Sequence, residues 1–217
     1  MNIVTSRVLK HQQFSETGFE LTITREGLDY AAGHCIQVMG REDTDSRSYT
    51  LASSPREENL RVLYRFIPEG VLTPQLVQLK EGDPVQWSGP FGEFEVRDPS
   101  RPLVFFATGS GVAPCAAYVS DNPELNLTLY HGVQKACDLF YRDVFSSYTY
   151  YPCVSREEAP GCYHGRVTLA AVSASFDPES HFYLCGSNEM IMDMYDLILG
   201  KGFDESVIFT EAYYRQL

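Results

Sequence analysis

One stretch organises the rest of the chain, Arg47-Ser48-Tyr49-Thr50-Leu51-Ala52-Ser53-Ser54-Pro55. Its alternation of Tyr and Thr with other residues is typical of a β-strand, which the proline ends. Four small hydroxyl residues and a leading arginine supply more hydrogen-bond donors than a sheet requires, which indicates a bound ligand. An arginine fork suits phosphate, and the tyrosine two positions on lies on the same side of a strand. The stretch therefore predicts a site for a pyrophosphate and a flat ring.

The same residues resemble the Arg-x-Tyr-(Ser/Thr)-x-x-Ser motif with which the ferredoxin–NADP⁺ reductase superfamily binds flavin. The resemblance implies that Arg47 meets the cofactor's phosphates, that Tyr49 packs on the flavin and that the Thr50 hydroxyl lies near flavin N5. Ser48 is assigned to the same site. On the residues alone, a solvated edge strand with an exposed arginine is the alternative, because short motifs also match by chance.

Short strand-like runs surround this stretch, at residues 3–9, 19–24, 35–39, 60–67 and 84–88. Strands this short and this regularly spaced favour an antiparallel β-barrel over a sheet with helices. Two residues of the fourth run, Tyr64 and Arg65, are assigned to the cofactor site. The segment Gly89-Pro90-Phe91-Gly92 resembles the one that closes the barrel in the superfamily.

One helical insertion is expected at Gly70-Val71-Leu72-Thr73-Pro74. Thr73 is a natural N-cap and Pro74 suits the first helical position. The free N–H groups of a helix start form an anion site, and the superfamily uses a similar Gly-x-x-(Ser/Thr) segment for the flavin pyrophosphate. An ordinary capped surface helix is the alternative.

The composition turns to structure-breaking residues at Asp98-Pro99-Ser100-Arg101-Pro102. Beyond this point the pattern changes from strand after strand to strands that alternate with helices. We therefore expect two domains: a flavin-binding antiparallel β-barrel at residues 1–99, and an NAD(P)-binding α/β domain with a parallel sheet at residues 100–217.

The second domain opens with a continuous apolar run at residues 103–107, as expected of a parallel strand buried on both faces. It leads into Thr108-Gly109-Ser110-Gly111-Val112-Ala113-Pro114. Two glycines let a strand turn tightly into a helix while the backbone approaches a phosphate. The segment also resembles the Ala-Thr-Gly-(Thr/Ser)-Gly-(Ile/Val)-Ala-Pro of the superfamily, which implies that residues 108–111 bind the nicotinamide nucleotide.

Further strands are expected at residues 125–130, 149–154, 181–184 and 207–210, and helices at 138–145, 169–174 and 188–199. Thr168 is expected to cap the second of these helices. The strand ends add Gly132, Val133, Ser155, Arg156, Cys185 and Gly186 to the cofactor site. His131 is interpreted as a loop residue with local hydrogen bonds, and it is left out of the site.

Ser155-Arg156 resembles the pair by which NADP-using members of the superfamily hold the ribose 2′-phosphate. Arg166 follows where the family often has a second cation. Glu157 and Glu158 argue for NAD, because a carboxylate usually receives a 2′-hydroxyl. On the residues alone, Arg156 pairing with a surface acid is the alternative. We predict a preference for NADPH over NADH.

Three residues are predicted to be catalytic: Thr50, Cys185 and Glu211. Cys185 resembles the family cysteine that touches the nicotinamide, and Glu211 resembles the carboxylate near the same ring, although free cysteines are most often buried structural thiols. Tyr213 resembles the tyrosine that stacks on the flavin and ends the plant-type members. Here residues 214–217 follow it, so stacking by Tyr213 stays open.

The composition excludes several classes of partner. A net charge of −12 and a pI near 4.8 argue against nucleic acid and anionic membranes. No apolar run approaches a membrane span and the first ten residues lack the core of a signal peptide, so a cytoplasmic location is expected. The six cysteines include no Cys-x-x-Cys pair and no iron–sulfur spacing. We therefore expect no iron–sulfur cluster and no other metal site.

Together these segments predict a flavoprotein oxidoreductase that transfers hydride between NADPH and bound FAD, with FMN as the alternative flavin. The resemblance implies ferredoxin or flavodoxin as electron partner, docked on a basic face drawn from Arg7, Lys10, Arg41, Arg56 and Lys80. The alternatives are an NADH-dependent flavin reductase or oxygenase reductase component, a non-catalytic electron-transfer subunit and a flavin-free binding module.

Overall fold

The computed structural model describes residues 2–40 and 46–213, and it divides into two compact units. Of these residues, the first unit contains 2–40, 46–96 and 113–123, and the second contains 97–112 and 124–213. The domain boundary between residues 99 and 100 stays a proposal. Arg41 and residues 214–217 lie outside the described part of the chain.

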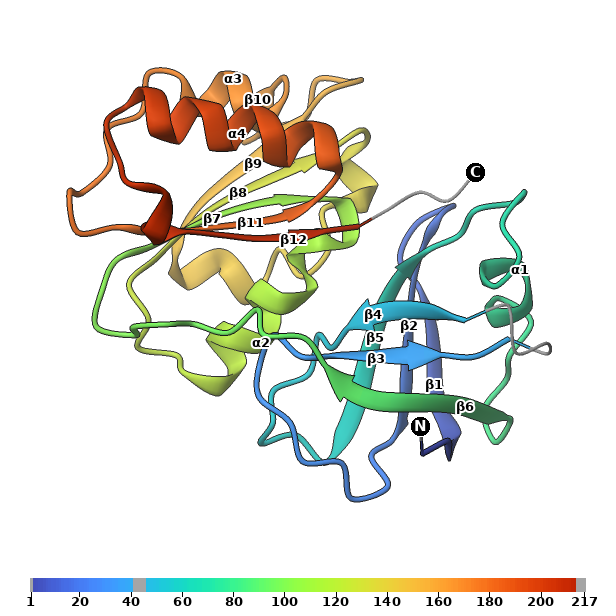
Figure 1. Ribbon diagram of the computed structural model, residues 1–217. Coiled ribbons are helices and arrows are strands. Elements are labelled where there is room, and N and C mark those ends of the chain that lie inside the picture. Colours follow the sequence, from blue (N-terminus) through green and yellow to red (C-terminus); the bar gives the residue numbers. More distant parts are fainter. Residues whose placement is uncertain (1, 41–45, 214–217) are drawn as a thin grey trace. The chain divides into compact units, whose positions relative to one another are not determined.

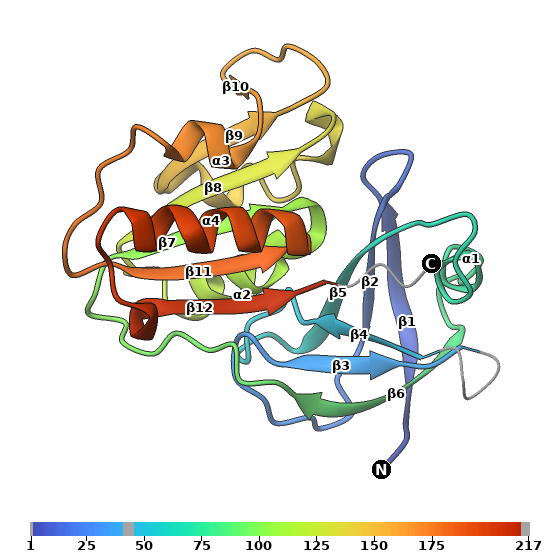
Figure 2. The same cartoon turned by 45° about the horizontal axis from the view of Figure 1, so that its top comes forward.

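The first unit contains an antiparallel sheet of six strands in the order β4-β3-β6-β1-β2-β5 (Figures 1 and 2). A bridge between Leu51 and Val62, with a bond of 2.9 Å from Ala52 N to Arg61 O, connects β4 to β5 and nearly closes a barrel. The strands are β1 (Val4–Gln13), β2 (Gly18–Thr24), β3 (Cys35–Val38), β4 (Arg47–Thr50), β5 (Asn59–Arg65) and β6 (Pro84–Phe91). The predicted antiparallel barrel is confirmed.

The barrel core follows from the two-residue period of its strands. Leu21 and Ile23 in β2 are each 1% exposed and point inward together. The single tryptophan, Trp87, is buried as well, and its Nε1 donates to Ser6 Oγ at 2.8 Å. Ser6 in turn donates to the Thr24 carbonyl at 2.6 Å. The buried polar atoms of Trp87 and Ser6 are thus bonded to each other and to the backbone.

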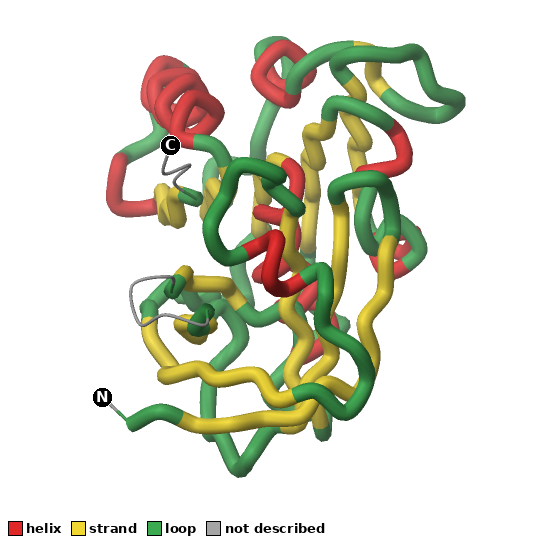
Figure 3. The backbone as a smooth tube through the Cα atoms, turned by 90° about the vertical axis from the view of Figure 1, so that its right-hand side faces the viewer, coloured by secondary structure: helices red, strands yellow, loops and turns green. Residues whose placement is uncertain are grey.

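The second unit contains a parallel sheet of six strands in the order β10-β9-β8-β7-β11-β12. Figure 3 distinguishes the strands, helices and loops of the chain by colour. Two helices, α3 (Val167–Ala171) and α4 (Asn188–Gly200), cover one face of this sheet (Figure 1). The strands are β7 (Leu103–Thr108), β8 (Leu127–Val133), β9 (Thr149–Val154), β10 (Tyr163–His164), β11 (His181–Gly186) and β12 (Ile208–Ala212). The predicted parallel α/β architecture is confirmed.

The hydrophobic patterns of strand β7 and helix α4 agree with the burial of their residues. All five residues of the apolar run at the start of β7 are at most 4% exposed, because the strand is covered on both faces. Helix α4 begins after Ser187, whose hydroxyl accepts a hydrogen bond from Met190 N at 3.4 Å. Its buried residues Met190, Ile191, Met194 and Ile198 form the apolar stripe that packs on the sheet.

The predicted helix at residues 138–145 is wrong. The segment instead contains two 3₁₀ turns, Ala136–Asp138 and Val144–Ser147. Tyr141, between them, has a φ of 58°, which a right-handed helix does not allow. The prediction also missed β10, because two exposed residues carry no period.

Two predicted N-caps are also wrong. Helix α1 (Thr73–Leu76) begins at Thr73 itself, and the hydroxyl bonds to Ile67, with Oγ1 3.0 Å from its N and 3.1 Å from its O. Thr73 therefore closes the loop before a helix of only four residues. Thr168 lies inside α3, where Arg166 is the N-cap residue and no side chain caps.

Candidate functional site

Strand β4 presents the predicted phosphate and ring residues. Arg47 and Tyr49 share one side of the strand, because they are two positions apart. The Arg47 Nη1 donates to the Ser46 carbonyl at 2.7 Å, and in the described part of the chain no carboxylate forms an ion pair with it. Ser48 is exposed, whereas Thr50 is 3% exposed.

The Tyr49 side chain packs against the hydrophobic core of the barrel. Its ring meets the ring of Tyr64 edge-on, with centroids 6.4 Å apart. Tyr64 is 1% exposed, and its hydroxyl bonds to His11 Nε2 at 2.8 Å. Burial raises the pKa of both phenols, so both are neutral. The structure thus places Tyr64 in the core and Arg65 on the surface, and their assignment to the cofactor stays a prediction.

Two of the four small hydroxyl residues in the opening stretch, Ser53 and Ser54, form hydrogen bonds within the protein. Ser53 is fully buried, and its Oγ accepts from Arg61 N at 3.1 Å and lies 2.9 Å from the Tyr30 hydroxyl. Ser54 Oγ accepts from Arg56 N at 3.1 Å. These bonds shape the turn after β4.

The loop before α1 is only partly accessible. Leu72 and Thr73 are 2% and 7% exposed, whereas the Val71 side chain is 52% exposed. Gly70 N donates to the Ile67 carbonyl at 3.0 Å. Any contact of this loop with a phosphate would thus involve its backbone, and this role stays a prediction.

The glycine turn lies at the carboxyl end of β7, as predicted. Residues 109–112 form a 3₁₀ turn in which Gly109 has a φ of +55°. A Cβ at Gly109 would meet nothing within 4 Å, whereas one at Gly111 would collide with the Cys185 carbonyl and lie 2.9 Å from Gly186 Cα. Gly109 therefore faces open space, and Gly111 allows the turn to pack on the end of β11.

The end of β11 is joined to the same turn. Ser187 N donates to Thr108 Oγ1 at 2.8 Å, and Gly186 has a φ of +131°. A Cβ at Gly186 would collide with Thr108 Oγ1 and lie 2.9 Å from its carbonyl oxygen. The ends of β7 and β11 therefore form one tightly packed edge.

Gly186→Ala is expected to destabilise the protein by about 1–3 kcal/mol, because the new methyl group meets backbone atoms in a left-handed conformation. The free energy of unfolding by urea measures this loss. Gly200→Ala is the matched control, since a Cβ there meets nothing within 4 Å and the residue is helical. A Gly186→Ala protein as stable as the parent would contradict the packing of this edge.

The structure brings the predicted Cys185 and Glu211 together. They are partners across β11 and β12, and the Cys185 Sγ lies 3.7 Å from Glu211 Oε2. Cys185 is fully buried, whereas Glu211 is partly exposed. Tyr213 follows, and its N donates to the Gly186 carbonyl at 2.8 Å. A thiol and a carboxylate thus lie next to the glycine turn.

The ends of β8 and β9 carry the predicted Ser-Arg pair. Ser155 Oγ donates to the Val133 carbonyl at 3.2 Å, so this hydroxyl also orders the strand end. Arg156 is exposed, and the described residues provide no ion pair for it. Glu157 Oε1 accepts from Ala136 N at 2.7 Å, which directs this carboxylate to the backbone. Gly132 packs against Val167, since a Cβ there would lie 2.8 Å from Val167 Cγ1.

Arg166, the predicted second cation, already forms an ion pair with a carboxylate. Its Nη1 lies 2.6 Å from Glu189 Oε1 in the first turn of α4, and both side chains are largely exposed. This pair raises the pKa of Arg166. An exposed pair of this kind contributes little stability, so a phosphate could compete for the arginine, and the assignment stays a prediction.

His131 is not the loop residue that the sequence indicated. It lies inside β8 with no exposed surface, 3.0 Å from the Gly109 carbonyl through Nε2 and 3.3 Å from the Tyr150 hydroxyl through Nδ1. Burial lowers the pKa of His131 to about 4. The interpretation was wrong because β8 extends three residues beyond its expected end.

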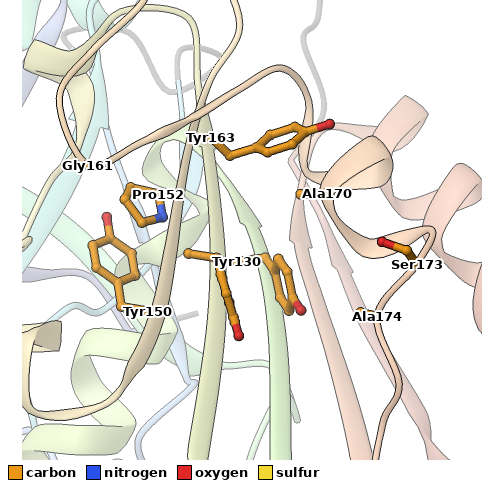
Figure 4. Close-up of a pocket in the computed structure, with 9 residues that line it drawn as sticks. Tyr130, Tyr150, Pro152, Gly161, Tyr163, Ala170, Ser173 and Ala174 are labelled. Carbon is orange, nitrogen blue, oxygen red and sulfur yellow. The ribbon is translucent and has the colours of Figure 1, made fainter.

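A pocket of about 380 Å³ lies on the α3 side of β8, β9 and β10 (Figure 4). Tyr163 and Ser173 are among its lining residues, as are Tyr130 and Tyr151, whose rings stack with centroids 4.6 Å apart. None of the residues predicted for the cofactor sites lines it.

Two further observations concern metals and membranes. The described residues contain no group of three or more His, Cys, Asp or Glu side chains that could hold a metal ion. None of the described helices is both long enough and apolar enough to cross a membrane.

Comparisons with known proteins agree with this architecture. Residues 4–96 match the family model of an oxidoreductase FAD-binding domain, and residues 105–196 match that of an oxidoreductase NAD-binding domain. The ferredoxin–NADP reductase of Pseudomonas aeruginosa is 32% identical over 182 residues, which cover 72% of this chain and 70% of that protein. The flavodoxin/ferredoxin–NADP reductase of Escherichia coli is 28% identical over 216 residues, covering 88% and 87%.

The fold is shared with solved structures. A ferredoxin–NADP⁺ reductase from Neisseria gonorrhoeae, solved with bound FAD and NADP, superposes with a TM-score of 0.87 at 20% identity and covers 98% of this chain and 99% of its own. With both family models in chain order, this chain belongs to the ferredoxin–NADP⁺ reductase superfamily of flavin- and nicotinamide-nucleotide-binding oxidoreductases.

Proposed function

We propose that the protein is an NADPH-dependent oxidoreductase that binds FAD on its barrel and exchanges electrons with ferredoxin or flavodoxin. The observation that carries this proposal is the edge of the parallel sheet. There the open turn at Gly109 and the Cys185–Glu211 pair lie together. Exposed Arg156 lies at the end of β9 in the same sheet.

The residues fit both cofactors. For flavin, Arg47 offers a cation that no described carboxylate neutralises, and Tyr49 offers a ring supported by Tyr64. For the nucleotide, Gly109 faces open space in which a phosphate could approach the backbone. The preference for FAD over FMN rests on the match to an FAD-binding family model.

The chain's own residues position rather than react. When bound, the two cofactors supply the redox chemistry, in which a hydride passes between nicotinamide C4 and flavin N5. The turn that contains Gly109 and Gly111 would hold the pyrophosphate. Cys185 and Glu211 would orient the nicotinamide ring, and the Thr50 hydroxyl would lie near the flavin. Positioning of this kind is worth large factors in rate.

The electron partner is proposed from relatives that are named for ferredoxin or flavodoxin. The basic face proposed for docking is smaller than the sequence indicated. Arg56 pairs with Asp121 at 3.1 Å, and Arg41 is outside the described residues. Arg7 Nη1 lies 3.4 Å from the carbonyl of Gly82, two residues after Lys80. Lys10 is exposed, and its Nζ donates to the neutral Gln12 Oε1 at 2.6 Å. Arg7, Lys10 and Lys80 therefore remain the proposed docking residues.

The proposal predicts that the purified protein is yellow and contains about one FAD per chain, and that Arg47→Ala binds it about 10- to 100-fold more weakly because a charged phosphate contact is lost. Absorbance and mass spectrometry of the released flavin measure both. Arg7→Ala, an arginine elsewhere on the barrel, is the control. A colourless parent would contradict the function, and full flavin affinity in Arg47→Ala would remove Arg47 from the site.

A further inference from the structure

A buried histidine lies directly behind the glycine turn. In the parallel pairing of β7 with β8, His131 is the partner of Ala107, the second residue before Gly109. His131 has no exposed surface, and its Nε2 lies 3.0 Å from the Gly109 carbonyl oxygen. It is the kind of buried polar side chain that must be hydrogen-bonded to be tolerated.

The contacts of His131 define which nitrogen carries its proton. A carbonyl oxygen only accepts, so Nε2 must donate to Gly109. Burial keeps the ring neutral at ordinary pH, because it lowers the pKa of His131 to about 4. Nδ1 is then an acceptor, and the Tyr150 hydroxyl, 3.3 Å away on β9, donates to it. Tyr150 packs in turn on buried Phe145, with ring centroids 5.7 Å apart.

This chain of contacts determines the direction of one peptide group. The peptide between Gly109 and Ser110 is planar and trans, so its C=O and N–H point in opposite directions. Because the carbonyl points to His131, the Ser110 N–H points away from His131. Gly109 holds this orientation in the left-handed region, at a φ of +55°. Without His131, the same peptide would lose the contact that fixes its plane.

We propose that His131 is a positioning residue for the coenzyme, which fixes the Gly109–Ser110 peptide so that the Ser110 N–H is directed at the pyrophosphate of a nicotinamide nucleotide. Tyr150 supports it by holding the tautomer that donates to Gly109. This inference rests on the proposed function of the glycine turn. It assigns to His131 a role in binding both coenzymes equally, since NADP and NAD share the pyrophosphate.

The test uses flavin-loaded protein and calorimetric titration with NADP⁺, NAD⁺ and adenosine 2′-monophosphate, which lacks the pyrophosphate. His131→Leu is expected to weaken the binding of NADP⁺ and of NAD⁺ by the same factor, roughly tenfold. Its affinity for adenosine 2′-monophosphate should be unchanged. His131→Gln, whose amide N–H can replace Nε2, is expected to recover most of the affinity. In ¹H–¹⁵N spectra of the parent, His131 is expected to carry its proton on Nε2 alone.

The outcomes separate the two proposals. A parent that binds neither NADP⁺ nor NAD⁺ overturns the proposed function and this inference with it. A parent that binds both, with parent-like affinities in His131→Leu, overturns the inference alone. If His131→Leu does not fold, Tyr150→Phe decides: loss of the hydroxyl that holds the tautomer should weaken the binding of NADP⁺ and NAD⁺ by one common factor, and parent-like affinities in Tyr150→Phe would overturn the inference. A proton on Nδ1 in the parent, or equal loss of adenosine 2′-monophosphate and NADP⁺ in these variants, overturns the role of His131.

Discussion

Replacing Arg156 with alanine is expected to lower the ratio of kcat/KM for NADPH to that for NADH by about 10- to 100-fold. The two coenzymes differ by a 2′-phosphate, a dianion that needs cationic partners. Arg156 is exposed at the end of β9, and the neighbouring Glu157 carboxylate is bonded to Ala136 N. Steady-state kinetics with each coenzyme measure the ratio.

Arg101→Ala is the matched control for this prediction. Arg101 precedes β7 at the amino-terminal ends of the parallel strands, opposite to the carboxyl ends where Arg156 lies. It pairs with Asp98 and Glu179. Its loss removes the same charge without touching the proposed coenzyme site, so the ratio should stay at the parent value. A parent that prefers NADH, or an unchanged ratio in Arg156→Ala, would show that the end of β9 is not a phosphate site.

The ion pair between Arg166 and Glu189 refines the same prediction. Because Glu189 already engages Arg166 at 2.6 Å, Arg166→Ala should change the coenzyme ratio less than Arg156→Ala does. Glu189→Gln should raise the preference for NADPH, since it releases the guanidinium and removes a negative charge. A lower preference for NADPH in Glu189→Gln would contradict a phosphate-binding role for Arg166.

Cys185→Ala and Glu211→Ala are each expected to slow flavin reduction by NADPH about 100-fold, while coenzyme affinity changes much less. The reason is that the thiol and the carboxylate, 3.7 Å apart, would align the reacting carbon rather than supply most of the binding energy. Anaerobic stopped-flow absorbance at increasing NADPH concentration separates the rate from the affinity. Cys137→Ser, at an exposed cysteine, is the control. Reduction at the parent rate in both alanine variants would remove the pair from catalysis.

The elements best predicted from the sequence are those in which local pattern and burial agree. The apolar run of β7 predicted a strand covered on both faces, the two glycines after it predicted a tight turn, and the structure contains both. The last helix, expected at residues 188–199, was also predicted within one residue at its end, because Gly202, at a φ of +91°, follows that end.

The errors arose where tertiary contacts override local chemistry. Threonine is a common N-cap residue, but the Thr73 hydroxyl is hydrogen-bonded to the backbone N and O of Ile67 across the loop. Ser53 and Ser54 were counted among the surplus donors of the stretch. In the folded turn, the backbone N–H groups of Arg61 and Arg56 donate to their hydroxyls. His131 was missed because only the parallel register, which places β8 beside the glycine turn, shows what its ring contacts.

The central claim is that this chain holds a flavin which NADPH reduces. Anaerobic titration of the purified, flavin-loaded protein with NADPH, followed by visible absorbance, tests it most directly. We expect loss of the oxidised flavin spectrum with about one equivalent of NADPH, because one two-electron donor reduces one flavin, and faster bleaching than with NADH. A flavin that stays oxidised in excess NADPH, or a protein that binds no flavin at all, would contradict it.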